Sequence, residues 1–245
     1  MTLAAPSTGG RLVYAVGDVH GHTDALRPLI RLLREDAARS APVERPLLVF
    51  LGDYVDRGPD SRGAIDMILA VEAEGPFEVV CLKGNHEDAL LRVLSDAHFG
   101  PNWIENWGEA TLRSYGVAVP AWGRAADETP RVQAELYDAL PPGHRRFLAR
   151  CVISLTVGDY LFVHAGVRPG VPLDAQEERD LMWIRYAFLE SDEDFGKVVV
   201  HGHTPSQTPE LKPNRIGIDT GVYMTGVLTA VRLEGTDQRF VQAMA

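Results

Sequence analysis

The chain has 245 residues, of which 45% are hydrophobic, and this is enough for one domain with a full buried core. Its formal net charge of −10 and the lack of a Lys/Arg-rich block argue against binding to nucleic acid through a basic face. No apolar run reaches the roughly 20 residues that span a bilayer, and the first residues lack a signal-peptide pattern. We therefore expect a cytoplasmic protein with neither nucleic-acid nor membrane partners.

The first ten residues are small, polar and Gly-rich, and they predict a flexible N-terminal tail over residues 1–10. No composition shift divides the remainder, so residues 11–245 are expected to form a single domain. Two cysteines, Cys81 and Cys151, lie in apolar runs. They predict buried thiols rather than a disulfide, as is usual in a reducing compartment.

Three apolar runs, each followed by Gly and then Asp or Asn, organise the first third of the chain. The runs at 12–16, 47–51 and 79–82 lead into Gly17-Asp18-Val19-His20-Gly21, Gly52-Asp53-Tyr54-Val55-Asp56-Arg57-Gly58 and Gly84-Asn85-His86-Glu87. Segments at about 23–39, 60–74 and 89–94 carry apolar residues at helical spacing. This alternation predicts a parallel sheet, with the three polar motifs at the edge where such sheets bind ligands.

The second half of the chain is less regular at first. Between residues 100 and 130, aromatic residues lie among Gly, Asn and Pro, which predicts irregular structure. Two interpretations remain open, an aromatic cluster under a long loop or a cap that walls the site and selects substrates. A short helix is expected at 141–151, a hairpin at 152–164 and a strand at 197–200. Residues 215–218 and 227–241 alternate like antiparallel strands.

Six side chains with oxygen or nitrogen donors stand at or just beyond predicted strand ends: Asp18, His20, Asp53, Asn85, His164 and His203. A mixed set without thiolates suits Mn²⁺, Fe or Zn²⁺ and argues against a structural cysteine site. Six ligands are too many for one catalytic ion, but they suit two ions about 3.5–4 Å apart that share a carboxylate. Asp53 is the expected bridge. His201 and His22 are expected beside the ligand set rather than in it.

Phosphoryl transfer is the chemistry that such a pair of ions predicts. Two divalent ions would give a bridging hydroxide near neutral pH, which attacks phosphorus directly. Arg57 is placed to bind the phosphate group. His86 is predicted to protonate the leaving oxygen as a general acid, with Asp56 as its partner.

With these motifs in this order, the chain resembles the phosphoprotein phosphatase family of serine/threonine protein phosphatases. This family belongs to the calcineurin-like metallophosphoesterases, and the chain looks most like the compact bacterial and phage members over residues 11–241. The resemblance implies an α/β (α+β) fold, a two-layer mixed β sandwich flanked by helices. Asp18, His20 and Asp53 would hold one ion, and Asp53, Asn85, His164 and His203 would hold the other. Mn²⁺ is the expected metal, with Fe or Zn²⁺ as alternatives.

The same resemblance implies the remaining roles. Arg185, in Trp183-Ile184-Arg185, would bind phosphate with Arg57, and His86 with Asp56 would form the general-acid pair. Asp219 receives no role. The expected enzyme is a hydrolase, a phosphoprotein phosphatase that acts on serine or threonine in phosphorylated proteins or peptides, with action on tyrosine left open. No regulatory subunit is implied.

Two other functions remain open. One is a small-molecule phosphoesterase, such as a dinucleoside polyphosphate hydrolase. Symmetrical diadenosine tetraphosphatases, which are close relatives, typically carry Ala at the position of Asp56 and Asp at that of Glu87, and this favours a protein phosphatase. The other is an inactive metal-binding module, which the complete ligand set and His86 disfavour.

Overall fold

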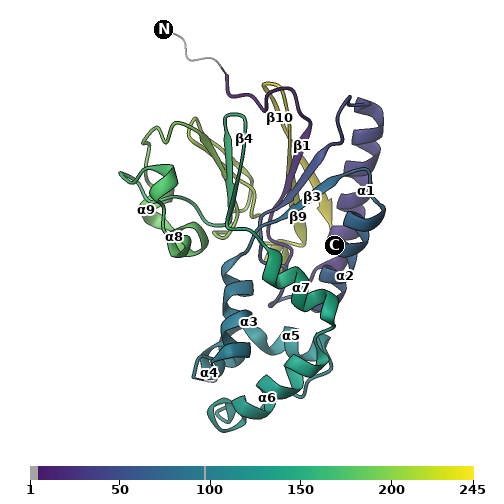
Figure 1. Cartoon of the computed structure of the whole chain (residues 1–245), viewed down its shortest axis with the longest axis vertical. Coiled ribbons are helices and arrows are strands. Elements are labelled where there is room, and N and C mark those ends of the chain that lie inside the picture. Colours follow the sequence, from purple (N-terminus) through teal and green to yellow (C-terminus); the bar gives the residue numbers. More distant parts are fainter. Residues whose placement is uncertain (1–4, 97) are drawn as a thin grey trace.

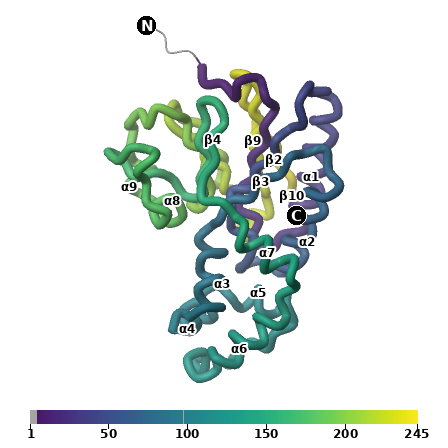
Figure 2. Tube along the Cα trace, in the orientation of Figure 1, coloured from purple at the N-terminus to yellow at the C-terminus, as the bar shows by residue number. Residues whose placement is uncertain are grey.

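Two mixed β-sheets face each other in the computed structural model, which describes residues 5–96 and 98–245 (Figure 1). Each sheet has five strands, in the orders β10-β9-β1-β2-β3 and β4-β5-β6-β8-β7. Helices lie along the outer faces, and a further group of helices extends below the sheets (Figure 2). The predicted two-layer mixed β sandwich flanked by helices is confirmed.

The first sheet contains the predicted βαβ units. Its strands are β1 (Val13–Val16), β2 (Leu47–Phe50), β3 (Glu78–Cys81), β9 (Val227–Glu234) and β10 (Asp237–Met244). β1, β2 and β3 run parallel, and β9 lies antiparallel to β1 and β10. The connections between the parallel strands are α1 (Thr23–Ser40) and α2 (Ser61–Glu74). Polar residues that follow β1, β2 and β3 therefore emerge at the same edge.

The second sheet begins with the expected hairpin, β4 (Ser154–Val157) and β5 (Tyr160–Val163). A 3₁₀ turn (Leu173–Ala175), α8 (Glu178–Trp183) and α9 (Tyr186–Leu189) connect β5 to the parallel strand β6 (Val198–His201). β8 (Arg215–Gly217) is parallel to β6 and antiparallel to the short β7 (Glu210–Leu211). The antiparallel prediction for 215–218 is thus wrong with respect to β6, because alternating polarity reports burial and not strand direction.

Alternate residues of the strands build two separate cores. Val13 and Ala15 pack with Tyr160 and Phe162 between the sheets. The intervening residues of β1, with Leu48 and Phe50 of β2, pack against α1 and α2 on the outer face of the first sheet. β1 and β2 are therefore buried on both sides, which explains their continuous apolar runs in the sequence.

Residues 85–150 are mostly helical, which corrects the expectation of irregular structure over 100–130. The elements are α3 (Asn85–Ser95), α4 (Gly100–Trp103), a π-helical segment (Ile104–Gly108), α5 (Glu109–Ser114), α6 (Ala125–Ala139) and α7 (Pro142–Arg150). Trp103 and Tyr115 are buried, whereas the Trp122 side chain is 89% exposed. Tertiary burial holds these short helices, since isolated helices of this length are unstable in water.

Several smaller expectations also concern the fold. Both cysteines are free, with Cys151 buried and Cys81 partly buried. Within the expected tail, the Ser7 carbonyl accepts from Asp159 N (2.8 Å) and Thr8 N donates to Gly235 O (3.2 Å); a flexible tail over 1–10 stays a prediction. Among the described residues, no helix has the length and apolarity needed to cross a membrane.

Candidate metal and phosphate site

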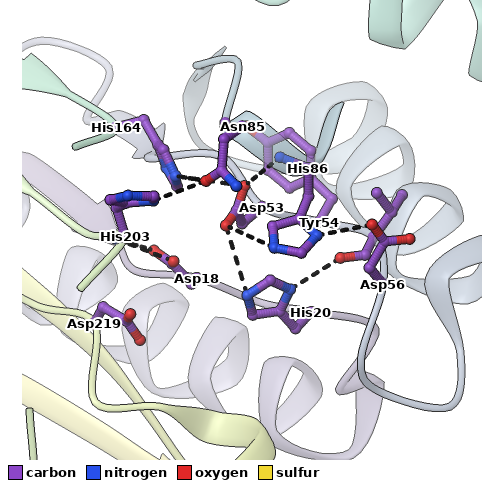
Figure 3. Close-up of polar contacts among 12 residues, drawn as sticks. Asp18, His20, Asp53, Tyr54, Asp56, Asn85, His86, His164, His203 and Asp219 are labelled. Atoms are coloured by element: carbon purple, nitrogen blue, oxygen red, sulfur yellow. Dashed lines mark hydrogen bonds and ion pairs between the residues drawn. The ribbon is translucent and has the colours of Figure 1, made fainter. Parts of the chain in front are cut away.

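All six predicted metal ligands are buried and come together at the strand ends (Figure 3). Asp18 and His20 follow β1, Asp53 follows β2, and Asn85 begins α3 after β3. His164 follows β5 and His203 lies two residues beyond β6. Both sheets therefore contribute to one cluster of side chains.

The potential ligand atoms form two groups, and inside each group they lie within 4.8 Å of one another. One group is His20, Asp53 and His86, and the other is Asp53, His164 and His203. Asp53 belongs to both groups, which is the position expected of a bridging carboxylate. Asn85 Oδ1 lies 2.9 Å from His164 Nε2 and 2.7 Å from His203 Nδ1. The second group thus has the amide oxygen that the sequence predicted beside it.

Asp18 does not belong to either group of ligand atoms that lie within 4.8 Å of one another. His86 completes the first group, with Nε2 3.9 Å from Asp53 Oδ2. The Asp18 carboxylate instead accepts a bond from His203 N, at 3.1 Å from Oδ2. Asp18 remains in the cluster, on the side of Asp219 (Figure 3).

Backbone carbonyls orient two of the histidines. His20 Nδ1 donates to Val55 O and His164 Nδ1 donates to Leu51 O, both at 2.9 Å. Their Nε2 atoms are therefore free of a proton in the neutral ring and face Asp53, at 3.6 and 3.4 Å. His203 faces the second group through Nδ1, which lies 2.7 Å from the same Asn85 Oδ1 that contacts His164 Nε2. These donors, together with the carboxylates, fit two divalent ions.

Unusual backbone conformations concentrate in the same place. Apart from Ala41, every described non-glycine residue with positive φ belongs to the predicted site: His20, Asp53, Asp56, Arg57 and His203. Each such residue costs about 1–3 kcal/mol, which other contacts must offset, and such strain is typical of functional sites.

Glu87 is one residue that offsets this strain, and it was not predicted to contribute. Its buried carboxylate accepts from Asp53 N and Tyr54 N, both at 2.7 Å, and from Gly84 N at 3.0 Å. A Cβ on Gly84 would lie 2.1 Å from Asp53 Oδ1, so only glycine permits this approach. Glu87 therefore holds the loop that carries Asp53.

The electrostatics of the cluster favour positive charge near its carboxylates. Burial, and next the Asp219 carboxylate, raise the pKa of Asp18 well above its ordinary value. Burial alone would raise the pKa of Asp53, but His164 and His86 hold it well below the usual range. Burial disfavours charge on His164, yet Asp53 raises the pKa of that ring to about 10. Bound cations would meet the same demand for positive charge.

His86 and Asp56 form the predicted pair. His86 Nδ1 lies 2.7 Å from Asp56 Oδ2, and the Asp56 side chain is fully buried. Burial opposes charge on His86, but Asp53 and Asp56 together raise its pKa above the ordinary value. The two carboxylates therefore favour the protonated form of His86, which is the form that a general acid needs.

Two further side chains hold Asp56, and the sequence did not identify either. Trp103 Nε1 donates to Oδ2 at 2.9 Å, and Thr111 Oγ1 donates to Oδ1 at 2.6 Å. Trp103 ends α4 and Thr111 lies in α5, so the helical segment after α3 reaches into the site. Both Asp56 oxygens are thereby fixed in direction.

Cationic and aromatic side chains surround the cluster at its rim. The Arg57 guanidinium is exposed and lies 4.5 Å from the ring centre of Tyr223, which in turn packs edge-on against His20. Trp107 lies 5.6 Å from His86 and 6.4 Å from Trp183, measured between ring centres. Arg185, also exposed, precedes α9. With burial and His164, it lowers the pKa of His203 to about 2.

The sequence placed His22 and His201 outside the ligand set and gave Asp219 no role. His22 precedes α1, with Nδ1 3.5 Å from Asp24. His201 is buried beside Gly202 O, outside both ligand groups. Asp219 is buried at the cluster, where burial raises its pKa to about 6. β8 is the short strand Arg215-Ile216-Gly217, which is not an apolar run followed by Gly and Asp, so the pattern that identified the three motifs did not identify Asp219.

Comparisons with known proteins agree with this geometry. Residues 12–225 match the family described as calcineurin-like phosphoesterase. The asymmetrical bis(5'-nucleosyl)-tetraphosphatase PrpE of Anoxybacillus flavithermus is 26% identical over 238 residues, covering 89% of this chain and 88% of that protein.

Two solved structures show the same fold. One, a candidate diadenosine tetraphosphatase, has a TM-score of 0.62 at 20% identity and covers 98% of both chains. A cold-active protein-tyrosine phosphatase from a psychrophilic Shewanella species has a TM-score of 0.55 at 16% identity, covering 96% of this chain and 81% of that one. The family match spans most of the sequence, so the chain belongs to the calcineurin-like phosphoesterases and is a metal-dependent phosphoesterase.

Proposed function

We propose that this phosphoesterase hydrolyses dinucleoside polyphosphates asymmetrically. The observation that carries the proposal is the similarity to an asymmetrical bis(5'-nucleosyl)-tetraphosphatase along nearly the whole of both chains. This favours the small-molecule alternative over the protein phosphatase that the sequence motifs suggested. Asymmetrical cleavage of the tetraphosphate yields a nucleoside triphosphate and a monophosphate.

The rim of the site supports a substrate with both phosphates and bases. Arg57 and Arg185 are exposed cations next to the cluster, and guanidinium groups bind phosphate oxygens in pairs. The rings of Trp107, Trp183 and Tyr223 are partly exposed beside them. Stacking of a base on an aromatic ring contributes about 1–3 kcal/mol.

The proposed metal ligands follow from the two groups of side chains. Asp53 would serve both sites; Asn85, His164 and His203 would complete one, and His20 and Asp18 would complete the other. When bound, two divalent ions supply water of lowered pKa and Lewis acidity toward phosphate oxygens. Mn²⁺ is the ion we propose, because the ligands are a mixture of carboxylate, amide and imidazole.

The chain's own groups perform the remaining tasks. Arg57 and Arg185 orient the phosphate and offset charge that develops on its oxygens. His86 donates its proton to the leaving oxygen, and Asp56 stabilises the imidazolium before transfer. Trp103 keeps the Asp56 carboxylate in the plane that this bond requires.

A phosphomonoesterase that acts on Ser or Thr residues is a second candidate, and the His86–Asp56 pair favours it. The leaving oxygen of a serine or threonine ester is a strong base that must be protonated as the bond breaks. A leaving polyphosphate is a much weaker base and needs less help from an acid. A buried imidazole and carboxylate, 2.7 Å apart, suit the former.

A direct comparison of substrates separates the two candidates. We would measure kcat/KM of Mn²⁺-loaded protein for diadenosine tetraphosphate and for phosphoserine and phosphothreonine peptides. The proposal predicts a large excess for the nucleotide, with ATP and AMP as products. ADP as the sole product, or a large excess for the peptides, would overturn it.

A variant then tests the role of the acid pair in each reaction. His86→Asn is expected to reduce peptide hydrolysis far more than nucleotide hydrolysis, because only the peptide releases a strongly basic oxygen. Equal losses of peptide and nucleotide hydrolysis in this variant would show that His86 does not act as the acid.

A further inference from the structure

Tyr223 contacts two residues of the proposed site, the metal ligand His20 and the phosphate-binding Arg57. Its half-buried ring meets the His20 ring edge-on, with 5.4 Å between the ring centres and 90° between the planes. The guanidinium carbon of Arg57 lies over the same ring, 4.5 Å from its centre. At this distance the negative face of an aromatic ring attracts a cation.

The turn that carries Tyr223 is fixed by its own backbone. α10 (Val222–Thr225) is a single helical turn between Gly221 and Gly226, and both glycines have positive φ. The buried Asp219 carboxylate accepts from Gly221 N at 2.8 Å, just before this turn. The ring is therefore presented to Arg57 from a turn whose entry and exit are both defined.

The backbone of Arg57 is fixed, but its side chain is not. Arg57 has a φ of 66°, and the next residue, Gly58, donates its N–H to Asp56 O at 2.8 Å. A Cβ on Gly58 would lie 1.9 Å from His20 O, so this loop packs directly on the segment after β1. The Arg57 side chain is exposed, and its guanidinium has no ion pair within residues 5–96 and 98–245. The Tyr223 ring is the contact that restricts it.

This kind of contact suits an arginine that binds an anion. A carboxylate partner would also fix the side chain, but it would occupy the N–H groups that must bind phosphate oxygens. An aromatic ring restricts the guanidinium without supplying a competing negative charge. The guanidinium is also close enough for its charge to act on both His20 and His86.

We propose that Tyr223 is a positioning residue, which holds the Arg57 guanidinium beside the cluster so that its N–H groups meet the incoming phosphate. The proposal rests on the phosphate-binding role of Arg57 in the proposed function. It does not depend on whether the phosphate belongs to a dinucleoside polyphosphate or to a peptide.

The first test measures the affinity for inorganic phosphate by isothermal titration calorimetry. The protein is loaded with Mn²⁺ and freed of excess ion, and Tyr223→Leu is compared with Tyr223→Phe. Tyr223→Leu should weaken phosphate binding about 2- to 5-fold, the effect of one exposed cation–π contact. Tyr223→Phe keeps the ring and should keep the wild-type affinity. No phosphate binding to the wild type, or equal affinity in the wild type and Tyr223→Leu, would overturn the proposal.

A double-mutant cycle shows whether the ring acts through Arg57. Arg57→Ala should weaken phosphate binding, and adding Tyr223→Leu to it should cause no further loss, because the guanidinium is already absent. Losses that multiply would show that the ring acts independently of Arg57, which would overturn the positioning role. An unchanged affinity in Arg57→Ala would overturn it too, together with the proposed role of Arg57.

The chain offers a matched control in Tyr137, which is 53% exposed on α6. The Arg145 guanidinium carbon lies 4.6 Å from the centre of its ring, so the contact resembles that of Arg57 with Tyr223. Tyr137→Leu should leave phosphate affinity unchanged. A loss as large as that in Tyr223→Leu would mean that the effect is not specific to the site, and would overturn the proposal.

The contact itself can be observed by NMR in the metal-free protein with ¹³C-labelled arginine. Protons held over an aromatic ring resonate upfield, so the Arg57 Hδ signals, assigned with Arg57→Ala, should lie upfield of their usual position. They should return to that position in Tyr223→Leu and stay upfield in Tyr223→Phe. Signals at the usual position in the wild type would overturn the proposal.

Metal content and substrate choice separate the remaining outcomes. All Tyr223 variants should bind as much Mn²⁺ as the wild type, because Val55 O orients His20; loss of Mn²⁺ in Tyr223→Leu would make its effect on phosphate indirect and overturn the proposal. A higher KM for diadenosine tetraphosphate with unchanged phosphate affinity would mean that the ring stacks on a base instead. If Tyr223→Leu weakens phosphate binding but the wild type does not cleave the tetraphosphate, the proposed function fails and the positioning role stands.

Discussion

Trp103→Phe tests how the helical segment after α3 supports the chemistry. Trp103 Nε1 and His86 Nδ1 both bond Oδ2 of the buried Asp56, at 2.9 and 2.7 Å. Phenylalanine keeps an aromatic ring but loses the N–H. The variant should therefore retain the fold, while Asp56 becomes free to turn away from His86.

The magnitude follows from the type of bond that is lost. A hydrogen bond to a charged group contributes about 1.5–3 kcal/mol. If that energy serves to position His86, it corresponds to about a 10- to 150-fold loss in rate. A domain of this size loses about 2–4 °C in Tm per kcal/mol, so Tm should fall by about 3–12 °C.

The assay compares kcat for phenyl phosphate and p-nitrophenyl phosphate with Mn²⁺ present. Phenolate is the stronger base and needs a proton from His86, so its release should slow about 10- to 150-fold. Release of p-nitrophenolate should change by less than about 3-fold, since this weak base needs little acid assistance.

The chain offers a matched control in Trp122→Phe, because Trp122 is 89% exposed and should tolerate the same exchange. If Trp103→Phe lowers kcat equally for both substrates, in proportion to the fraction of unfolded protein, the positioning role is refuted. Thr111→Val, which removes the bond to Asp56 Oδ1, should show the same leaving-group dependence. Thr111→Ser keeps a hydroxyl and should retain wild-type activity on both substrates.

Three further predictions concern charge and metal. Asp56→Asn removes a charge that raises the pKa of His86, so the alkaline limb of the kcat–pH profile for phenyl phosphate should move to lower pH; an unmoved limb would contradict this. Arg57→Ala should reduce kcat/KM about 10²-fold by removing a phosphate contact, and an unchanged value would exclude that contact. Chelation should lower Tm by about 10–20 °C, reversed by excess Mn²⁺, because each of two ions at 100 times its Kd stabilises by about 2.7 kcal/mol. Equal melting curves with and without Mn²⁺ would contradict binding at the buried cluster.

The strand ends were the part of this fold that the sequence predicted best. An apolar run followed by Gly and a polar ligand predicted the positions of Asp18, Asp53 and Asn85, because parallel strands align their carboxyl ends. His164 and His203 joined them from the second sheet. The local pattern is strongest for β1 and β2, because burial on both sheet faces leaves polar residues only at the ends of these strands.

The sequence did not predict the residues that hold this cluster in place. Trp103 and Thr111 lie 47 and 55 positions from Asp56, on short helices that only tertiary burial stabilises. Glu87 acts through four backbone N–H groups of strained loops, and no side-chain pattern reports such bonds. Periodicity also could not give the direction of β8, since parallel and antiparallel strands share the same alternation.

Metal stoichiometry tests the central claim, that Asp53 joins two ion sites, most directly. We would load the wild type and Asp53→Ala with Mn²⁺, remove free ions and count bound metal by mass spectrometry, with Glu105→Ala as an exposed control. The geometry predicts about two ions per chain in the wild type and in the control, and loss of both in Asp53→Ala. One ion in the wild type, or two retained in Asp53→Ala, would contradict a shared carboxylate.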